Sequence, residues 1–107
     1  MLEQCYGPIE ATVLERAAEI KLLICDVDGV LSNGYIYLGD NGEEFKTFHA
    51  RDGYGIRCLL TSDIDVAIIT GRKSNIVERR IKELGIKYCY QGQLNKLAAF
   101  DDLCQKT

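Results

Sequence analysis

The chain has 107 residues, of which 47% are hydrophobic and 27% are charged, and its formal net charge is −3. This composition predicts one small globular domain. It argues against a nucleic-acid-binding protein, which usually presents a basic surface. No run approaches the ~20 apolar residues that cross a membrane. Segment 1–7 lacks the basic and apolar regions of a secretory signal, so we expect a cytoplasmic protein without a membrane partner.

The cysteines are scattered along the chain and form no C-x-x-C pair, so neither a disulfide framework nor a zinc site is predicted. They are Cys5, Cys25, Cys58, Cys89 and Cys104. We expect these side chains to be small buried groups or inert thiols.

The first half of the chain predicts a helix, a strand and a hairpin. Apolar residues at helical spacing indicate a helix over residues 9–19, with Pro8 at its first turn. The apolar run 22–25 indicates a strand buried on both faces, which ends at Asp26. Residues 34–48 indicate a β-hairpin, because an Asn-Gly turn separates two strand-like runs.

The second half alternates helices with buried strands. The expected elements are a helix at 55–60, a strand at 64–69, a helix between Ser74 and Gly85, a strand at 86–90 and a helix at about 95–105. Alternation of this kind implies a parallel α/β sheet. In such sheets ligands bind at the carboxyl ends of the strands, and the polar motifs of this chain fall there.

The first of these motifs is Asp26-Val27-Asp28-Gly29. Its two acids leave the strand on the same side, ~7 Å apart at Cα. One carboxylate could attack a phosphorus atom and form an aspartyl phosphate. The other could protonate the leaving oxygen and then deprotonate a water. Taken alone, the motif fits an ordinary acidic turn equally well.

Two further motifs follow the next strands. Thr70-Gly71-Arg72 offers a hydroxyl and backbone N–H groups before a helix, which together can cradle a phosphate. Lys96 opens the last helix, where an ammonium could neutralise the phosphate and keep Asp26 ionised. The three motifs in this order are far more specific than any one of them.

The combination of Asp-x-Asp, Thr and Lys at successive strand ends resembles the haloacid dehalogenase (HAD) superfamily across almost the whole chain. The resemblance implies a Rossmann-like, three-layer α/β/α fold. It implies that Asp26 is the nucleophile, Asp28 the general acid and base, Thr70 a phosphate-binding hydroxyl and Lys96 the charge-balancing lysine. It also implies a Mg²⁺ ion held by the Asp26 carboxylate and the Asp28 backbone carbonyl.

Segments 31–37, 51–57, 67–72 and 90–96 narrow the resemblance to a branch that hydrolyses 3-deoxy-D-manno-octulosonate 8-phosphate in lipopolysaccharide biosynthesis. In that branch a hairpin replaces the cap domain and joins subunits into a homotetramer, which fits residues 34–48. The implied substrate contacts are Asp28, His49, Ala50, Arg51, Asp52, Gly53, Arg57, Gly71, Arg72, Arg80 and Lys96.

The chain departs from the superfamily at one motif. An acidic loop after a fourth parallel strand, which supplies another magnesium carboxylate, is missing, and Asp101-Asp102 does not replace it because it lies inside a predicted helix. We therefore expect residues 1–107 to be a single incomplete domain, a fragment of a longer phosphatase. We also expect weak Mg²⁺ binding and an exposed edge on the strand that carries Asp26.

Two alternatives stay open. The first is a phosphatase for another eight- or nine-carbon acidic sugar phosphate, with the same chemistry. The second is a non-catalytic oligomeric module, in which the hairpin assembles subunits and the site is inert.

Overall fold

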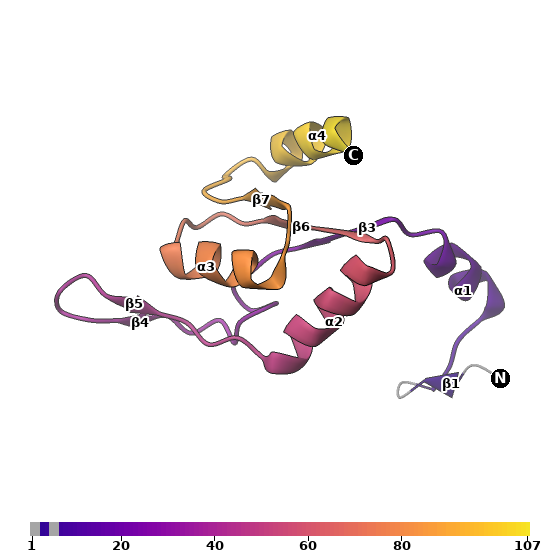
Figure 1. Ribbon diagram of the computed structural model, residues 1–107, viewed down its shortest axis with the longest axis horizontal. Helices are drawn as coiled ribbons and strands as arrows, with labels where there is room; N and C mark the ends of the chain where they lie inside the picture. The colour runs from indigo at the N-terminus through magenta and orange to yellow at the C-terminus, as the bar shows by residue number, and fades with distance from the viewer. Residues whose placement is uncertain (1–2, 5–6) are drawn as a thin grey trace.

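A parallel sheet forms the centre of the computed structural model, which describes residues 3–4 and 7–107. Its strands, in spatial order, are β3 (Leu22–Cys25), β6 (Asp65–Ile69) and β7 (Tyr88–Tyr90). Helices α2 (Ala50–Thr61) and α3 (Asn75–Leu84) cover one face, and α4 (Lys96–Lys106) covers the other (Figure 1). The predicted three-layer α/β/α arrangement is confirmed.

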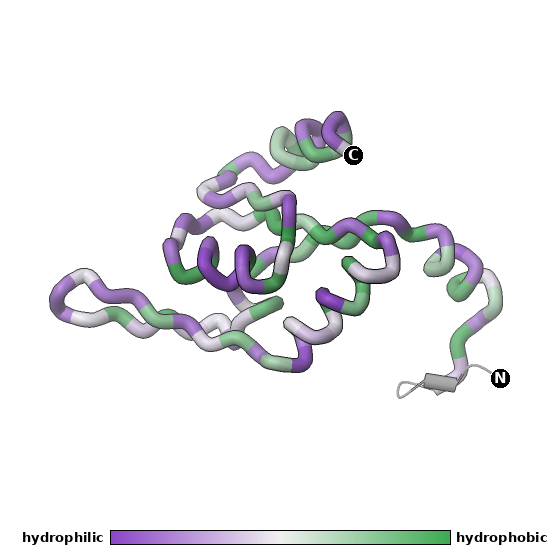
Figure 2. Tube along the Cα trace, viewed as in Figure 1, coloured by the Kyte–Doolittle hydropathy of each residue, from purple (hydrophilic) through white to green (hydrophobic). Residues whose placement is uncertain are grey.

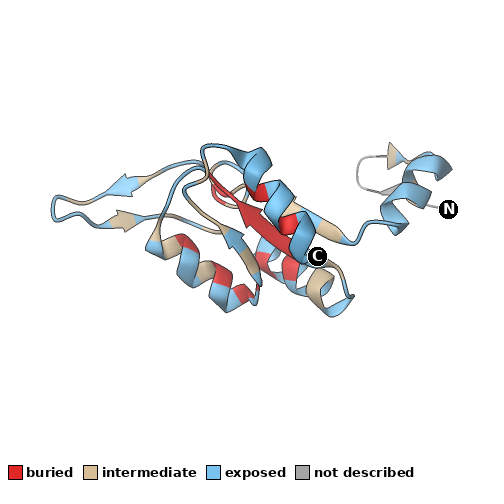
Figure 3. Cartoon of the chain, turned by 90° about the horizontal axis from the view of Figure 1, so that it is seen from above, coloured by how far each residue is buried: buried red, intermediate tan, exposed pale blue. Residues whose placement is uncertain are grey.

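The central strand β6 supplies both halves of the hydrophobic core. Because side chains alternate along a strand, Val66 and Ile68 pack on the side of α2 and α3, whereas Ala67 and Ile69 pack on the side of α4. Figure 3 shows β6 as the most completely buried element, and Figure 2 shows hydrophobic segments running through the sheet. The uninterrupted apolar run of this strand therefore reflects burial on both faces.

Helix α3 shows how the local pattern sets an element. Val77, Ile81 and Leu84 are buried on one face. Gly85 ends the helix in the left-handed conformation, with φ of 79°, and its N–H points to the last carbonyls of the helix. Ser74 occupies the N-cap, although its side chain makes no capping hydrogen bond.

Helix α2 begins five residues earlier than the sequence predicted. His49 is its N-cap, and the His49 Nδ1 accepts a hydrogen bond of 3.0 Å from the backbone N–H of Arg51. Asp52 adds a negative charge to the first turn, which the helix dipole favours. The sequence pattern does not indicate this start, because histidine is not among the preferred capping residues.

The N-terminal helix is shorter than predicted. Helix α1 spans Ala11–Ala18, and Pro8 lies before it in β2 (Gly7–Pro8), which pairs with β1 (Glu3–Gln4). Pro8 is therefore not in the first helical turn. In Figure 1 these elements lie at one end of the molecule, away from the sheet.

The predicted hairpin is confirmed, although its strands are short. Strand β4 (Tyr37–Leu38) pairs antiparallel with β5 (Glu44–Phe45), and a bridge between Ser32 and Phe48 closes the base. The hairpin projects from the body of the molecule (Figure 1), and its apolar side chains, Tyr37, Leu38 and Phe45, are exposed.

The cysteine side chains differ in how far they are buried. Of the cysteines in the described part of the chain, Cys25 is half-buried, whereas Cys58, Cys89 and Cys104 are exposed. Of the two expectations for these three, burial is therefore excluded, and an inert thiol stays a prediction. All four are free thiols, and Cys5 lies outside the described residues.

Within residues 3–4 and 7–107, no helix has the length and apolar character needed to cross a membrane.

Candidate active site

Three of the predicted residues meet at the carboxyl ends of the strands. Asp26 follows β3, Thr70 follows β6, and Lys96 opens α4 after β7. The parallel register places Cys25 beside Ile68, so Asp26 and Thr70 follow neighbouring strands at their carboxyl ends. The Lys96 Nζ lies 3.2 Å from the Asp26 Oδ2. The topology therefore brings a carboxylate, a hydroxyl and an ammonium together.

The surroundings of Asp26 keep its carboxyl group ionised. Its Oδ1 accepts a hydrogen bond of 2.7 Å from the backbone N–H of Val27. Burial raises the pKa of Asp26, but the Val27 N–H and the side chains of Lys96 and Thr70 together outweigh burial and hold this pKa below its ordinary value. An ionised carboxylate is the form that can act as a nucleophile.

This arrangement predicts the effect of removing the ammonium. The change Lys96→Met should raise the pKa of Asp26 in the metal-free protein, measured by carboxyl ¹³C NMR, because one group that favours the ionised form is lost. A carboxyl group whose pKa is lower in the folded than in the unfolded protein stabilises the fold at pH values above its unfolded-state pKa. This contribution is lost as the pH falls through the folded-state pKa. In Lys96→Met that loss should begin at a higher pH.

The matched control is Lys82→Met, because Lys82 is exposed on α3 and pairs only with Glu78 among the described residues. It should leave the pKa of Asp26 unchanged. An Asp26 pKa that is the same in Lys96→Met and in the parent protein would contradict this account.

Backbone hydrogen bonds hold the Thr70 loop. The Thr70 N–H donates to the Tyr90 carbonyl at 2.9 Å, and the Thr70 carbonyl accepts from the Gln93 N–H at 2.9 Å. The Arg72 carbonyl accepts from the Gly92 N–H at 3.1 Å, which ties the loop after β6 to the loop after β7. Thr70 is buried, while Gly71 and Arg72 remain exposed next to it. This placement suits the predicted phosphate cradle at the start of α3.

The second acid, Asp28, has a partner that sequence analysis did not predict. The Lys46 Nζ lies 2.7 Å from the Asp28 Oδ1 and 3.7 Å from the Glu44 Oε1. Lys46 directly follows β5, so the base of the hairpin lies beside the Asp-x-Asp turn. The sequence contains one signal for this cluster: opposite charges at Glu44 and Lys46, two residues apart, share one face of a strand.

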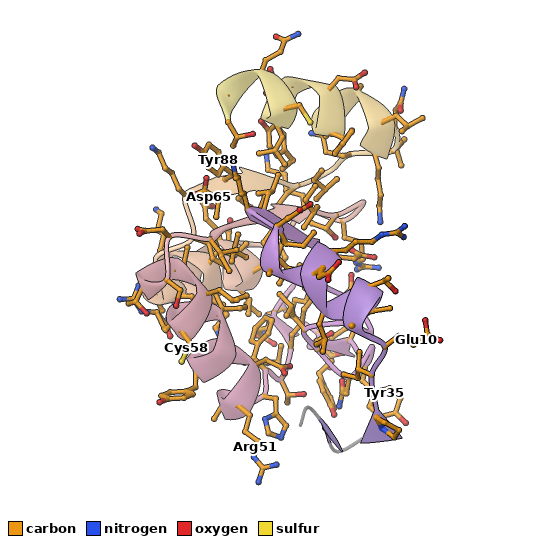
Figure 4. All side chains as sticks on the ribbon, turned by 90° about the vertical axis from the view of Figure 1, so that its right-hand side faces the viewer. Glu10, Tyr35, Arg51, Cys58, Asp65 and Tyr88 are labelled. Atoms are coloured by element: carbon orange, nitrogen blue, oxygen red, sulfur yellow. The ribbon has the colours of Figure 1, made fainter. Side chains whose placement is uncertain are left out.

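The residues predicted from position 49 to 53 form the start of α2. His49 caps the helix and the Arg51 side chain points away from the body of the molecule (Figure 4). Ala50 and Asp52 are exposed in the first turn. Gly53 is buried against Arg80, and a Cβ at this position would lie 2.5 Å from the Arg80 Nη2. The structure thus brings Gly53 and Arg80 together, but it gives Arg51 no contact with Asp26.

The two helical arginines have different surroundings. The Arg80 guanidinium lies 5.7 Å from the centroid of the Phe48 ring, at the base of the hairpin. The Arg57 Nη1 donates a hydrogen bond of 3.0 Å to the Leu84 carbonyl. Leu84 ends α3, which runs back from the carboxyl end of β6. Arg57 therefore lies near the amino ends of the strands, whereas Asp26 lies at their carboxyl ends. It stabilises the end of a helix there.

Two cavities flank the candidate site. One, of about 390 Å³, is lined by residues of the hairpin base and α3, among them Lys46, Phe48, Arg79 and Arg80. The other, of about 280 Å³, runs beside Asp26 and Lys96 along β3 and is lined mainly by apolar side chains. Within the described chain β3 pairs only with β6, so the predicted exposed edge is present.

The oxygen donors at the site suit a hard cation but are few. The Asp26 carboxylate and the Asp28 backbone carbonyl are the kind of ligand that Mg²⁺ prefers. Among residues 3–4 and 7–107, no group of three or more His, Cys, Asp or Glu side chains could hold a metal ion. Asp101 and Asp102 lie inside α4, as expected, and the Asp102 Oδ2 accepts a hydrogen bond from the Tyr90 hydroxyl.

Comparison with known proteins gives close relatives, although no family model matches the chain. It is 65% identical, over 105 residues, to the 3-deoxy-D-manno-octulosonate 8-phosphate phosphatase KdsC of Escherichia coli K12, covering 98% of this chain and 56% of that protein. The corresponding protein of Yersinia pestis is 61% identical over 102 residues, covering 95% and 54%.

Comparison of the fold with solved structures also finds phosphatases of this name. The crystal structure of the Yersinia pestis phosphatase superposes with a TM-score of 0.94 at 59% identity, covering 98% of this chain and 57% of that one. The Moraxella catarrhalis phosphatase, in complex with a magnesium ion, a phosphate ion and KDO, gives 0.85 at 47% identity, covering 89% and 55%. A putative HAD superfamily hydrolase from Legionella pneumophila gives 0.84 at 45% identity, covering 87% and 51%.

The chain spans about half the length of the curated relatives it matches. Within that span the similarity includes the parallel sheet and the strand ends that carry Asp26, Thr70 and Lys96. Over about half of their length, the chain is therefore similar in sequence and in fold to 3-deoxy-D-manno-octulosonate 8-phosphate phosphatases.

Proposed function

We propose that the chain is part of a magnesium-dependent phosphatase that hydrolyses 3-deoxy-D-manno-octulosonate 8-phosphate to KDO and phosphate, for lipopolysaccharide biosynthesis. The observation that carries this proposal is the ionised Asp26 carboxylate, 3.2 Å from the Lys96 ammonium and beside the Thr70 hydroxyl. The names of the relatives and the KDO, phosphate and magnesium bound to the Moraxella catarrhalis phosphatase support it.

In the proposed mechanism a carboxylate oxygen of Asp26 attacks phosphorus, and the bond between phosphorus and the sugar oxygen breaks. Asp28 gives its proton to the departing oxygen, so the sugar leaves as an alcohol. Lys96 and Thr70 bind the phosphoryl oxygens. Asp28, now a carboxylate, takes a proton from a water that attacks phosphorus, and the bond to Asp26 breaks to release phosphate.

The Asp26 carboxylate and the Asp28 backbone carbonyl would hold Mg²⁺. When bound, the ion supplies positive charge that stabilises the phosphoryl group in the transition state. Two protein ligands are few for this ion, so we expect weak Mg²⁺ binding by these residues alone.

We further propose that Gly71, Arg72, Arg80 and the first turn of α2 contact the sugar phosphate, since arginines pair well with phosphate and carboxylate groups. Arg57 is a weaker candidate, because its guanidinium is engaged by the Leu84 carbonyl. The exposed apolar side chains of the hairpin support assembly into a homotetramer. A cytoplasmic location remains part of the proposal.

The test is phosphate release from 3-deoxy-D-manno-octulosonate 8-phosphate with Mg²⁺, for the 107-residue chain and for a protein extended to the length of the relatives. We expect turnover by the longer protein and little or none by the short chain, since the short one offers few metal ligands. If neither folded protein releases phosphate, the proposal fails. Full activity in the short chain would contradict the argument about metal ligands.

A nine-carbon acidic sugar phosphate, assayed in parallel, separates the proposed substrate from its nearest alternative. A higher kcat/KM for the nine-carbon compound would keep the chemistry and change the substrate.

The second candidate function is a non-catalytic assembly module. The small set of metal-binding side chains and the exposed hairpin favour it for residues 1–107. Measurement of molecular mass together with a Mg²⁺ titration decides the question: a stable tetramer without affinity for Mg²⁺ supports the module.

A further inference from the structure

We propose that Lys46 is a positioning residue for Asp28. The inference rests on the proposed phosphatase function, in which Asp28 transfers protons. In this proposal Lys46 holds one oxygen of the Asp28 carboxyl group, so that the other oxygen is presented to the leaving group and then to water. The hairpin therefore contributes to the chemistry of its own subunit, in addition to any role in assembly.

The contact between Lys46 and Asp28 is short and largely buried. The Lys46 Nζ donates to the Asp28 Oδ1 at 2.7 Å, and the Lys46 side chain is 1% exposed. Charge-assisted hydrogen bonds of this length are strong, and burial removes the screening and the side-chain freedom that weaken surface pairs. The Asp28 side chain keeps 24% exposure, so it can still reach a substrate.

The two oxygens of Asp28 have different surroundings. Oδ1 accepts from Lys46, whereas Oδ2 has no hydrogen-bond partner among the described residues. A carboxyl group that is held at one oxygen carries its transferable proton on the other. Lys46 thereby selects Oδ2 as the atom that donates to the sugar oxygen and accepts from water.

Glu44 makes the ammonium hard to replace. The Glu44 Oε1 is buried, has no hydrogen-bond partner in the described part of the chain, and lies 3.7 Å from the same Lys46 Nζ. The same ammonium therefore lies between the carboxyl groups of Asp28 and Glu44. No other cation in the described part of the chain contacts these two groups, so its removal frees the Asp28 carboxyl group, which is 24% exposed, to turn toward water.

The test uses the leaving group to isolate proton donation. An alkyl phosphate such as the sugar phosphate needs a proton on its departing oxygen, whereas p-nitrophenyl phosphate departs as a stable phenolate. In a protein of the relatives' length, Lys46→Met should lower kcat/KM for the sugar phosphate at least about tenfold, a part of the ~10²–10⁴ that general acid catalysis contributes. It should lower kcat/KM for p-nitrophenyl phosphate much less.

The double variant shows whether Lys46 acts through Asp28. Once Asp28→Asn has removed the proton donor, adding Lys46→Met should cause little further loss. Lys82→Met, an exposed lysine on α3, is the matched control and should behave like the parent protein. If Lys46→Met does not fold, Lys46→Gln is the second variant: it keeps part of the buried stem, but its uncharged side chain is one bond shorter and falls short of the Asp28 Oδ1, so it should show the same selective loss.

The outcomes are distinguishable. A parent protein that hydrolyses neither compound overturns the proposed function itself. With an active parent, an equal loss on both phosphates, or additive losses in the double variant, assigns Lys46 to structure alone and overturns this inference. Parent-like activity of folded Lys46→Met or Lys46→Gln toward the sugar phosphate overturns it as well.

Discussion

Replacement of Asp26 by Asn should abolish hydrolysis of 3-deoxy-D-manno-octulosonate 8-phosphate in a protein of the relatives' length, with a fall in kcat of about 10⁴-fold or more. An amide oxygen does not form the aspartyl phosphate, so the first chemical step has no nucleophile. The fold should persist, because Asn has the same shape and the Asp26 side chain is 37% exposed at the end of its strand. Phosphate release under saturating substrate, together with circular dichroism, measures both.

Asp65→Asn is the matched control. Asp65 opens β6 at the amino end of the sheet, opposite the site, and it is exposed. This variant should retain the activity of the parent protein. Substantial turnover by Asp26→Asn would show that another group attacks phosphorus, and the assignment of the nucleophile would have to be abandoned.

The largest expected effect on stability comes from Ile68→Ala. Ile68 is fully buried in the middle of β6, where it packs among the core residues beneath α2 and α3. Truncation removes apolar contacts and leaves a cavity, so the free energy of unfolding should fall by about 2–5 kcal/mol. That is a large part of the ~5–15 kcal/mol that stabilises a typical domain. Urea denaturation followed by circular dichroism measures the loss.

Val13→Ala provides the comparison, because Val13 is 53% exposed on α1. Its free energy of unfolding should stay within about 0.5 kcal/mol of the parent value, as for most surface substitutions. Equal destabilisation by the two variants would mean that β6 is not the centre of the core.

Much of the fold follows from local patterns. The apolar runs that became β3 and β6 and the Gly85 that ends α3 were predicted, because a strand-length apolar run and a left-handed cap each leave a signature in a few adjacent residues. The predicted burial of β3 on both faces is wrong: Leu23 is exposed and the other residues of β3 are half-buried. The meeting of Asp26, Thr70 and Lys96 was also predictable. Parallel strands place their carboxyl ends at one edge, so residues at those ends converge without any knowledge of side-chain contacts.

Other features depend on packing between distant segments. The early start of α2 depends on a histidine that caps through Nδ1, which is an unusual choice. Arg57 was expected at the substrate, and the structure places it at the end of α3, because its helix packs beside that end. Burial was one of two expectations for the cysteines, and three of them are exposed, since residue type alone does not tell which face of a helix or strand meets the core.

The sequence by itself determined the parallel α/β class, the hairpin and the order of the polar strand ends, because each of these depends on periodicity and on residues that are close together along the chain. Only the tertiary structure decided that Lys46 reaches Asp28 across 18 positions of sequence and that its ammonium is buried between two carboxylates. Such a contact requires the base of the hairpin, where the chain returns from β5, to lie beside the Asp-x-Asp turn. Its strength comes from burial, which is a property of the packed molecule and of no local segment.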